Sequence, residues 1–364
     1  MTNKLVVENL RFRPVRTALS VLAIGIEVVM ILTIVGISRG MIVDSQRRMR
    51  GVGADVLVRP PGTSAISLSS APIPEKMVDF IERQPHVASA VGTMNHPVGG
   101  VTVVTGVDLA RFTRMSGGFR YLKGGPPRQP NDLVVDRYYA QQKKLHAGSM
   151  VELMNRQWRV SGIIEEGKLT RLVVPIQILQ DLTSNPGKIS QIFVKVDNPA
   201  NTDEVVLELK SKLKDYQVYS MEEFVSLLSV DHVPGLAEFI GVIIGLSIVV
   251  GFLVVFLSMY TAVLERTREI GILKALGASP SFIIGILMRE TSVLAIAGSL
   301  IGIALSYGTR WLIMTLVPGS LSQYIVPDWW PIAGGIALAG ALLGSAYPGW
   351  RAARQDPIEA LSYE

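Results

Sequence analysis

The stretch TALSVLAIGIEVVMILTIVGI, residues Thr17–Ile37, contains a single charged residue, Glu27. A helix of about 20 apolar residues crosses a hydrocarbon core about 30 Å thick, so this stretch predicts a membrane span. Three further apolar stretches follow, from about Phe239 to Leu264, from Thr291 to Thr309 and from about Trp330 to Tyr347. The sequence therefore predicts an α-helical membrane protein with four transmembrane helices.

A secretory signal is the alternative interpretation of the first stretch, because basic residues precede it. The apolar run is longer than the roughly 7 to 15 residues of a signal's apolar region, and no clear small-x-small cleavage site follows. We therefore expect a retained helix, which also gives the even number of crossings that the charge pattern requires. The basic residues in question are Lys4, Arg11, Arg13 and Arg16.

Composition supports a membrane protein and excludes several other classes. Only 18% of the residues are charged, against about 25% in an average soluble protein. The net charge of +5 could suggest nucleic acid, but the charges lie beside the apolar stretches, which indicates a membrane surface instead. The lack of cysteine excludes disulfides, thiol nucleophiles and cysteine-ligated metals.

Basic residues in short loops predict the orientation of the helices. They occur in the N-terminal segment, in the loop after the second stretch and in the C-terminal tail, whereas residues 317–329 contain none. We expect a multi-pass protein of the cell inner (plasma) membrane, with both termini and the 265–281 loop in the cytoplasm. Arginines after the first stretch argue weakly against this, but long translocated domains largely escape the rule.

About 195 residues of ordinary soluble composition separate the first two stretches. They predict an α+β extracytoplasmic domain, inserted between transmembrane helices 1 and 2 and large enough for two lobes. Asn201 and Ser220 are predicted N-caps, the second in a capping box with Glu223. The predicted strands are Ala54–Val58, Val101–Val107, Met150–Met154, Trp158–Ile164 and Gln191–Val196, with a turn at 155–157, and the predicted helices are Pro74–Gln84, Thr202–Leu213 and Met221–Leu228.

These patterns divide the chain into eight segments. Residues 1–40 hold an N-terminal amphipathic helix and transmembrane helix 1, 41–235 the extracytoplasmic domain, 236–264 transmembrane helix 2 and 265–281 a cytoplasmic helix. Residues 282–316 form transmembrane helix 3, 317–329 an external loop, 330–348 transmembrane helix 4 and 349–364 a cytoplasmic tail.

Enzyme signatures are weak. Gly162–Thr170 resembles a phosphate-binding loop, but Leu169 replaces the magnesium-binding Ser or Thr, and Glu165 and Glu166 would repel phosphate. A strand followed by a glycine turn explains it better. The four histidines have no metal-ligand spacing, and no G-x-S-x-G motif occurs. We predict neither a catalytic residue nor a metal site.

Glu27 lies about ten residues, or roughly 15 Å of helix, from the cytoplasmic end of its span, which places it near the membrane midplane. One interpretation is a protonated glutamate hydrogen-bonded across a helix interface. The other is a functional residue that faces a protomer interface or a substrate-accessible cavity. Small-residue spacings predict close helix packing, at Gly241 with Gly245, Gly298 with Gly302, and Gly340 with Gly344.

Residues 265–280 combine charged and apolar side chains. A helix over Thr267–Leu276 would carry an apolar stripe beside a charged one and end at Gly277. Such a helix fits the groove of a partner protein, or else lies in the lipid headgroups. Composition alone does not choose between the two.

The stretch ERTREIGILKALGAS, Glu265–Ser279, closely resembles the E-R-x-x-E-I-G-I-L-(K/R)-A-L-G-A-S signature of the MacB/FtsX-type ABC transporter permease superfamily. The resemblance continues at Glu8–Leu19, at Gly53–Val58 and in the tail from Tyr347 to Leu361. The external domain is similar in layout more than in residues.

The resemblance implies a homodimer of four-helix permeases that works with ABC ATPase subunits on separate chains. ATP and magnesium would bind the ATPase, so this chain is expected to need no cofactor and to have no enzymatic activity of its own. A periplasmic adaptor protein is a further partner that the resemblance allows. The implied ATPase-coupling residues are Glu265, Arg266, Arg268, Glu269, Gly271, Leu273, Lys274, Leu276 and Gly277.

The expected function is export or extraction of an amphiphilic or hydrophobic substrate, such as a lipid, by mechanotransmission. In that mechanism ATP binding closes the ATPase subunits, and the long helices then change the shape of the external domain. The alternative is a transmembrane signal transmitter that activates an extracytoplasmic cell-wall hydrolase. A membrane-bound enzyme, the second alternative, has no catalytic constellation in the sequence to support it.

Overall fold

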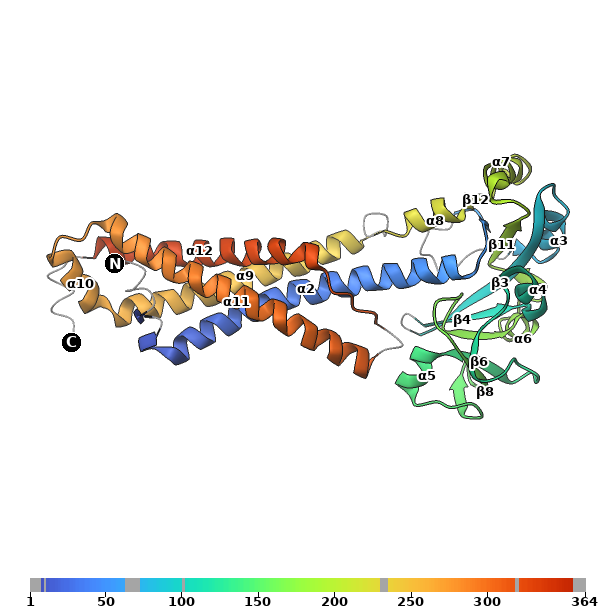
Figure 1. Cartoon of the computed structure of the whole chain (residues 1–364), viewed down its shortest axis with the longest axis horizontal. Helices are drawn as coiled ribbons and strands as arrows, with labels where there is room; N and C mark the ends of the chain where they lie inside the picture. The colour runs from blue at the N-terminus through green and yellow to red at the C-terminus, as the bar shows by residue number, and fades with distance from the viewer. Residues whose placement is uncertain are drawn as a thin grey trace. The chain divides into compact units, whose positions relative to one another are not determined.

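The computed structural model describes residues 8–9, 11–62, 73–99, 102–229, 235–317 and 321–355. The chain separates into two units. The helical unit comprises Met1–Ser38, Ala237–Leu312 and Gln323–Glu364, and the sheet unit comprises Arg39–Leu236 and Ile313–Ser322 (Figure 1). Residues 63–72, His232 and the tail beyond residue 355 lie outside the described residues.

Four helices in the described part of the chain are long and apolar enough to cross a membrane, which confirms the four predicted spans. One of them runs past its predicted end at Ile37, because the following residues are mostly good helix formers such as Arg, Met and Gln. The four are α2 (Pro14–Gly51), α9 (Leu236–Glu265), α11 (Pro280–Leu316) and the segment Pro327–Arg354, which joins η3 (Pro327–Trp329) to α12 (Trp330–Arg354).

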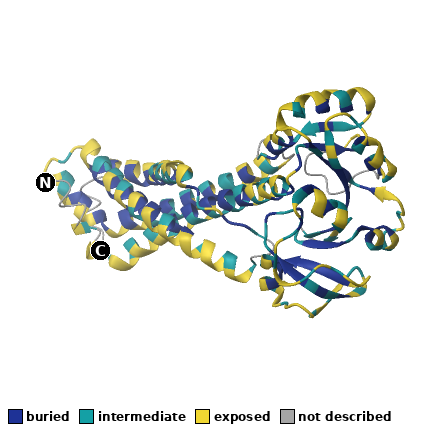
Figure 2. Cartoon of the chain, turned by 45° about the vertical axis from the view of Figure 1, so that its right-hand side comes forward, coloured by how far each residue is buried: buried dark blue, intermediate teal, exposed yellow. Residues whose placement is uncertain are grey.

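Glycines let the helices approach closely. A Cβ atom at Gly298 of α11 would lie 2.7 Å from Cβ of Ile24, and one at Gly302 would lie 2.7 Å from the carbonyl oxygen of Gly25. A Cβ at Gly344 would lie 2.8 Å from a carbonyl oxygen of α9. Gly241, Gly245 and Gly340 have nothing within 4 Å of such a Cβ. The outward faces remain exposed and apolar, as membrane lipid requires (Figure 2).

The sheet unit is built on one mixed sheet, which has ten strands among the described residues. Its order is β12-β1-β11-β3-β4-β9-β6-β8-β5, with β7 paired to β8. Pairing is antiparallel except between β4 and β9 and between β6 and β8. The strands are β1 (Val56–Arg59), β3 (Val87–Gly99), β4 (Thr102–Val107), β5 (Tyr121–Gly124), β6 (Asp132–Asp136), β7 (Met150–Leu153), β8 (Arg156–Ile164), β9 (Leu172–Pro175), β11 (Gln191–Val196) and β12 (Gln217–Ser220).

Helices cover both faces of this sheet. Along β1, Val56 and Val58 join one apolar cluster while Leu57 joins another, so alternate residues reach opposite faces. The first cluster includes side chains of α3, α5, α6 and α7, and the second includes α4, α8 and Val52. Figure 2 shows the strands dark blue between these helices. The helices are α3 (Lys76–Glu82), α4 (Leu109–Ser116), α5 (Arg137–Lys143), α6 (Ile176–Leu182), α7 (Thr202–Lys212) and α8 (Met221–Leu227), with the short η1 (Pro199–Asn201) and the two-stranded sheet of β2 (Ile73–Pro74) and β10 (Lys188–Ile189).

The five predicted strands and three predicted helices of this unit are present, with small shifts at their ends. The Ser220 cap is confirmed, since its hydroxyl accepts a hydrogen bond from the amide of Glu223 at 3.0 Å. Asn201 occupies the N-cap position of α7 as predicted, but its side chain accepts no capping hydrogen bond, and its amide donates to Asp197 at 3.0 Å. The turn of the β7–β8 hairpin lies at Met154 and Asn155, both with positive φ, rather than at 155–157. One sheet with a core on each face replaces the suggested two lobes.

Candidate functional site

The predicted coupling segment folds as helix α10 (Thr267–Ala275), which follows α9 directly and precedes α11. Leu276 is its C-cap, and Gly277 adopts φ +93°, a conformation that suits glycine. The helix has two distinct faces. Thr267, Ile270 and Gly271 are buried in the helical unit, whereas other residues of the segment lie on the surface.

A buried charge cluster fixes the start of α10. Glu290 of α11 is only 1% exposed, and its two carboxylate oxygens each lie 3.3 Å from an arginine, one from Arg16 and the other from Arg266. Arg266 also donates to the carbonyl oxygen of Asn9 at 3.0 Å. Glu265 pairs with Arg13 and lies 3.5 Å from Arg16. The cluster therefore connects the N-terminal segment, the α9–α10 junction and α11.

Lys274 fixes the other end of α10. Its ammonium donates to the carbonyl oxygen of Ala353 at 2.9 Å and also to that of Gln355. These carbonyls belong to the end of α12, where the last turn has no partners within the helix and favours a cation. Lys274 thus caps α12 and ties α10 to it.

Three predicted coupling residues, Arg268, Glu269 and Leu276, form what we call the exposed strip together with their neighbour Ile272, and all four are exposed. Leu276 is 81% exposed and Ile272 is 45% exposed. Leu273 is half-buried beside the strip and lines a groove of about 320 Å³ that also includes Ile283 and Leu287 of α11. An apolar strip flanked by charges, next to an apolar groove, is a surface suited to a protein partner.

The signature thus separates into anchoring and exposed residues. Arg266, Gly271 and Lys274 pack or bond within the helical unit, while Glu265 pairs inward with arginines although its side chain is partly exposed. Sequence reasoning did not identify Glu290 as a functional or structural residue. Glu290 is the only acidic residue of α11, and Arg13 and Arg16 precede an apolar stretch, so charge pairing was the available signal.

Glu27 is 5% exposed and lies between α2 and α9, against Gly251. A Cβ atom at Gly251 would lie 1.9 Å from Oε2 of Glu27, so only glycine leaves room for this carboxyl. Oε1 of Glu27 accepts no hydrogen bond from a described residue. The Glu27 side chain therefore lies between α2 and α9, and both interpretations of this residue stay predictions.

The described residues contain no group of three or more His, Asp or Glu side chains placed to hold a metal ion. The segment that resembles a phosphate-binding loop ends strand β8 and leads through Gly167, with φ +99°, to strand β9. A phosphate-binding loop needs a helix at that point. The strand-and-glycine-turn interpretation is confirmed.

Two families match the chain. Residues 17–212 match the MacB-like periplasmic core domain, and residues 241–357 match the FtsX-like permease C-terminal domain. The first match ends within α7 of the sheet unit, and the second contains α10, the groove beside it and Glu290.

Similar proteins include the uncharacterized ABC transporter permease YknZ of Bacillus subtilis, 31% identical over 60% of this chain. The uncharacterized ABC transporter permease MJ1507 of Methanocaldococcus jannaschii is 27% identical over 61% of it. The macrolide export ATP-binding/permease protein MacB of Salmonella paratyphi A is 28% identical over 60% of it. The aligned regions span 55%, 59% and 35% of these relatives' own lengths.

Two solved structures are similar to the sheet unit. The periplasmic region of MacB from Actinobacillus actinomycetemcomitans has 17% identity and a TM-score of 0.37, covering 48% of this chain and 92% of that one. The extracellular domain of YknZ, from Gram-positive bacteria, has 14% identity and a TM-score of 0.35, covering 46% of this chain and 99% of that one.

Proposed function

Because this chain belongs to the MacB/FtsX-type family of ABC transporter permeases, we propose that it couples ATP hydrolysis by an ABC ATPase to the export or extraction of an amphiphilic substrate. ATP and magnesium would bind the ATPase, and the helices of this chain would transmit the movement of the ATPase across the membrane. The proposal includes a second copy of the chain and an adaptor protein as partners.

The exposed strip on α10 is the observation that carries this proposal. Large apolar side chains such as Leu276 are expected to find a partner when they protrude beside charged residues on a rigidly held helix. The rigidity comes from the Glu290 cluster at the start of α10 and from Lys274 near its end. A force applied to the exposed strip would thus act on α9, α11 and α12 together. Helix α10 lies between α9 and α11 in the chain, and Lys274 bonds it to the end of α12.

The connectivity of the long helices supports the proposal of mechanotransmission. Helix α9 joins the sheet unit directly to α10, since it begins at Leu236 and ends two residues before Thr267. Helix α2 contributes residues to both units without interruption. Helices resist axial compression and bending, so a displacement at α10 would be delivered to the sheet unit with little loss. We place α10 in the cytoplasm and the sheet unit outside, in keeping with the distribution of basic residues.

The proposal is tested by replacing Leu276 with Asp. We expect association with the ATPase, measured by co-purification from membranes after mild extraction, to fall by about tenfold or more, because an apolar anchor becomes a charge. The matched control is Leu207→Asp on α7, which alters a leucine that is 69% exposed in the sheet unit. Full ATPase association of Leu276→Asp, with normal membrane insertion, would refute the assignment of α10 as the coupling helix.

A further inference from the structure

One end of the sheet carries the excess positive charge of the sheet unit. Residues Tyr121–Ile164 form this end, which comprises β5, β6, α5, β7 and β8 (Figure 1). They include seven Lys and Arg but only three Asp and Glu. The rest of the sheet unit has seventeen residues of each sign. A net charge confined to one part of a domain attracts a partner of the opposite charge.

The three acidic residues do little to offset these cations at the surface. Asp132 and Asp136 are each only 1% exposed. Asp132 pairs with Arg159 at 2.7 Å, and Asp136 lies 3.3 Å from Arg48 of α2. Of the three, only Glu152 is exposed. The surface of this end is therefore more basic than its net charge indicates.

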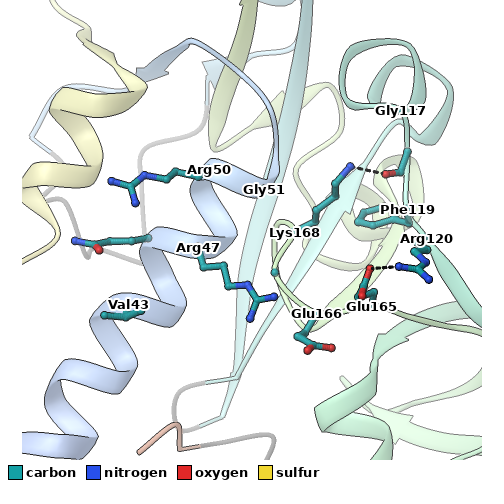
Figure 3. A pocket seen from close by; sticks show the side chains of 13 residues that line it. Val43, Arg47, Arg50, Gly51, Gly117, Phe119, Arg120, Glu165, Glu166 and Lys168 are labelled. Atoms are coloured by element: carbon teal, nitrogen blue, oxygen red, sulfur yellow. Dashed lines mark hydrogen bonds and ion pairs between the residues drawn. The ribbon is translucent and has the colours of Figure 1, made fainter. Parts of the chain in front are cut away.

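Some of the cations here already have acidic partners. Arg120, which comes just before β5, pairs with Glu165 at 3.3 Å (Figure 3). Arg137 of α5 lies 2.5 Å from Glu166, whose side chain is 6% exposed. These pairs are internal to the sheet unit and leave both arginines engaged within the protein.

Four other cations of this end have exposed side chains that form no hydrogen bond or ion pair with a described residue. We call them the basic patch: Lys123, Arg128, Lys143 and Lys144. A partner could pair with them without first breaking an ion pair of this chain.

Backbone contacts bring the members of the basic patch together. The loop 145–149 follows α5 and lies against the end of β5, since a Cβ atom at Gly124 would lie 3.1 Å from Cβ of Ala147. Gly124 directly follows Lys123 on β5. Ala147 lies three residues after Lys144, at the end of α5. The lysines of β5 and α5 therefore belong to segments that touch.

A cavity of about 270 Å³ lies at this contact, and its lining includes Arg128, Gly124 and Gly148. Each of these two glycines has an exposed apolar residue two positions away. Leu122 is 40% exposed and Met150 is 57% exposed. Exposed apolar side chains among unpaired cations are typical of a surface that binds a protein. A polyanion without apolar groups would make no use of them.

We propose that the basic patch binds an acidic segment of a partner protein, in which carboxylates are interspersed with apolar side chains. The carboxylates would pair with the cations of the patch, and the guanidinium of Arg128 can donate two parallel hydrogen bonds to one of them. Leu122 and Met150 would contact the apolar side chains. The segment would thus lie across β5 and the loop 145–149, at the edge of the sheet.

This inference goes beyond the proposed function, because no residue of α10 takes part in it. Binding is measured on the full chain alone, without an ATPase. Leu276→Asp, which is expected to lose the ATPase, is therefore expected to bind the acidic segment normally. The two proposals can fail separately.

The test uses the full chain in a non-ionic detergent and three fluorescent probes: a peptide of four Glu-Glu-Leu repeats, a peptide of four Glu-Glu-Ser repeats with the same charge, and a linear inorganic polyphosphate of similar charge. Fluorescence anisotropy should show the leucine peptide binding about tenfold more tightly than the serine peptide, because only its side chains remove apolar surface from water. Added salt should weaken the binding of both peptides, since it screens exposed charges.

The charge contribution is tested by the triple variant Lys123→Gln, Lys143→Gln, Lys144→Gln. It should weaken both peptides by about tenfold or more, because three attractive charges are lost. The matched control changes three exposed lysines elsewhere in the sheet unit and should leave binding unchanged. Its substitutions are Lys188→Gln, Lys210→Gln and Lys214→Gln.

The apolar contribution is tested by Leu122→Ser with Met150→Ser. This variant should lose the preference for the leucine peptide and bind the serine peptide as the unaltered chain does. Thermal unfolding of every variant shows whether it is folded, and the charge and apolar variants test the surface independently of each other.

Three results would overturn the proposal. The first is equal affinity for the two peptides in the unaltered chain. The second is unchanged binding in the folded triple-lysine variant. The third is tighter binding of the polyphosphate than of the leucine peptide, which would assign the basic patch to an anionic polymer instead of a protein.

Discussion

His86 and Asp197 form an exposed ion pair that links the start of β3 to the end of β11. Nδ1 of His86 lies 3.1 Å from Oδ2 of Asp197. The hydrogen bond to Asp197 raises the pKa of His86, and hydrogen bonds from Asn201 and His86 lower the pKa of Asp197. The pair is therefore charged on both sides between these two pKa values.

The sign of the pH effect follows from the two shifts. The contribution of His86 to stability is complete below its unfolded pKa of about 6.5 and is lost as pH rises through the raised folded value. The contribution of Asp197 is complete above its unfolded pKa of about 3.9 and is lost as pH falls through the lowered folded value. The pair therefore stabilises the fold most in the mildly acidic range between the two unfolded pKa values, about 3.9 and about 6.5.

We predict that Asp197→Asn lowers the pKa of His86 toward about 6.5, because the carboxylate that holds the proton is gone. Nuclear magnetic resonance of the full chain with labelled histidine measures this, and His86→Gln assigns the signal. An unchanged His86 titration in Asp197→Asn would show that the pair does not form in solution.

Single residues were predictable where a local rule decides their role. The Ser220 cap needs only a serine and a glutamate three positions later, and it was found from the sequence. Asn201 takes the predicted N-cap position without a capping hydrogen bond, and its amide donates to Asp197, a residue that the capping rule does not consider. Glu290 and Glu166 escaped prediction for a related reason: their burial depends on segments distant in sequence.

At the scale of elements, the membrane helices were the most predictable, because length and hydropathy alone define them. Strands β2, β3, β5, β6, β9, β10 and β12 were missed, and β6 and β9 show why. The sheet is covered on both faces, so Asp132–Asp136 and Leu172–Pro175 are buried at nearly every position and show no alternation of apolar and polar residues. An unbroken short apolar run does not distinguish a strand from a buried helical turn.

Helix packing gives a prediction at this scale. Gly298→Leu should destabilise the helical unit by about 1 to 3 kcal/mol, because the added Cβ atom would lie 2.7 Å from Cβ of Ile24 of α2, closer than van der Waals contact allows. The control Gly308→Leu adds the same side chain to the same helix where nothing lies within 4 Å, and it should be neutral or slightly stabilising. Unfolding in detergent by sodium dodecyl sulfate compares the two, and equal stability would contradict the packing of α11 on α2.

At the scale of the whole molecule, the proposed orientation is open to a direct measurement, because the chain has no cysteine. Ser279→Cys lies just after α10, and Ser211→Cys lies near the end of α7; both positions are exposed. A membrane-impermeant maleimide added to intact cells should label Ser211→Cys and leave Ser279→Cys unlabelled until the membrane is opened. The reverse pattern would invert the proposed topology.

The order of strands in the sheet also determines how the protein can be made. Val56 of β1 pairs with Val194 of β11 and with Ser220 of β12, both far later in the chain. At about 5 to 20 residues synthesised per second, β1 emerges roughly 7 to 28 s before its first partner. During synthesis the nascent segment therefore carries strand β1 unpaired until residues 191–220 have been made.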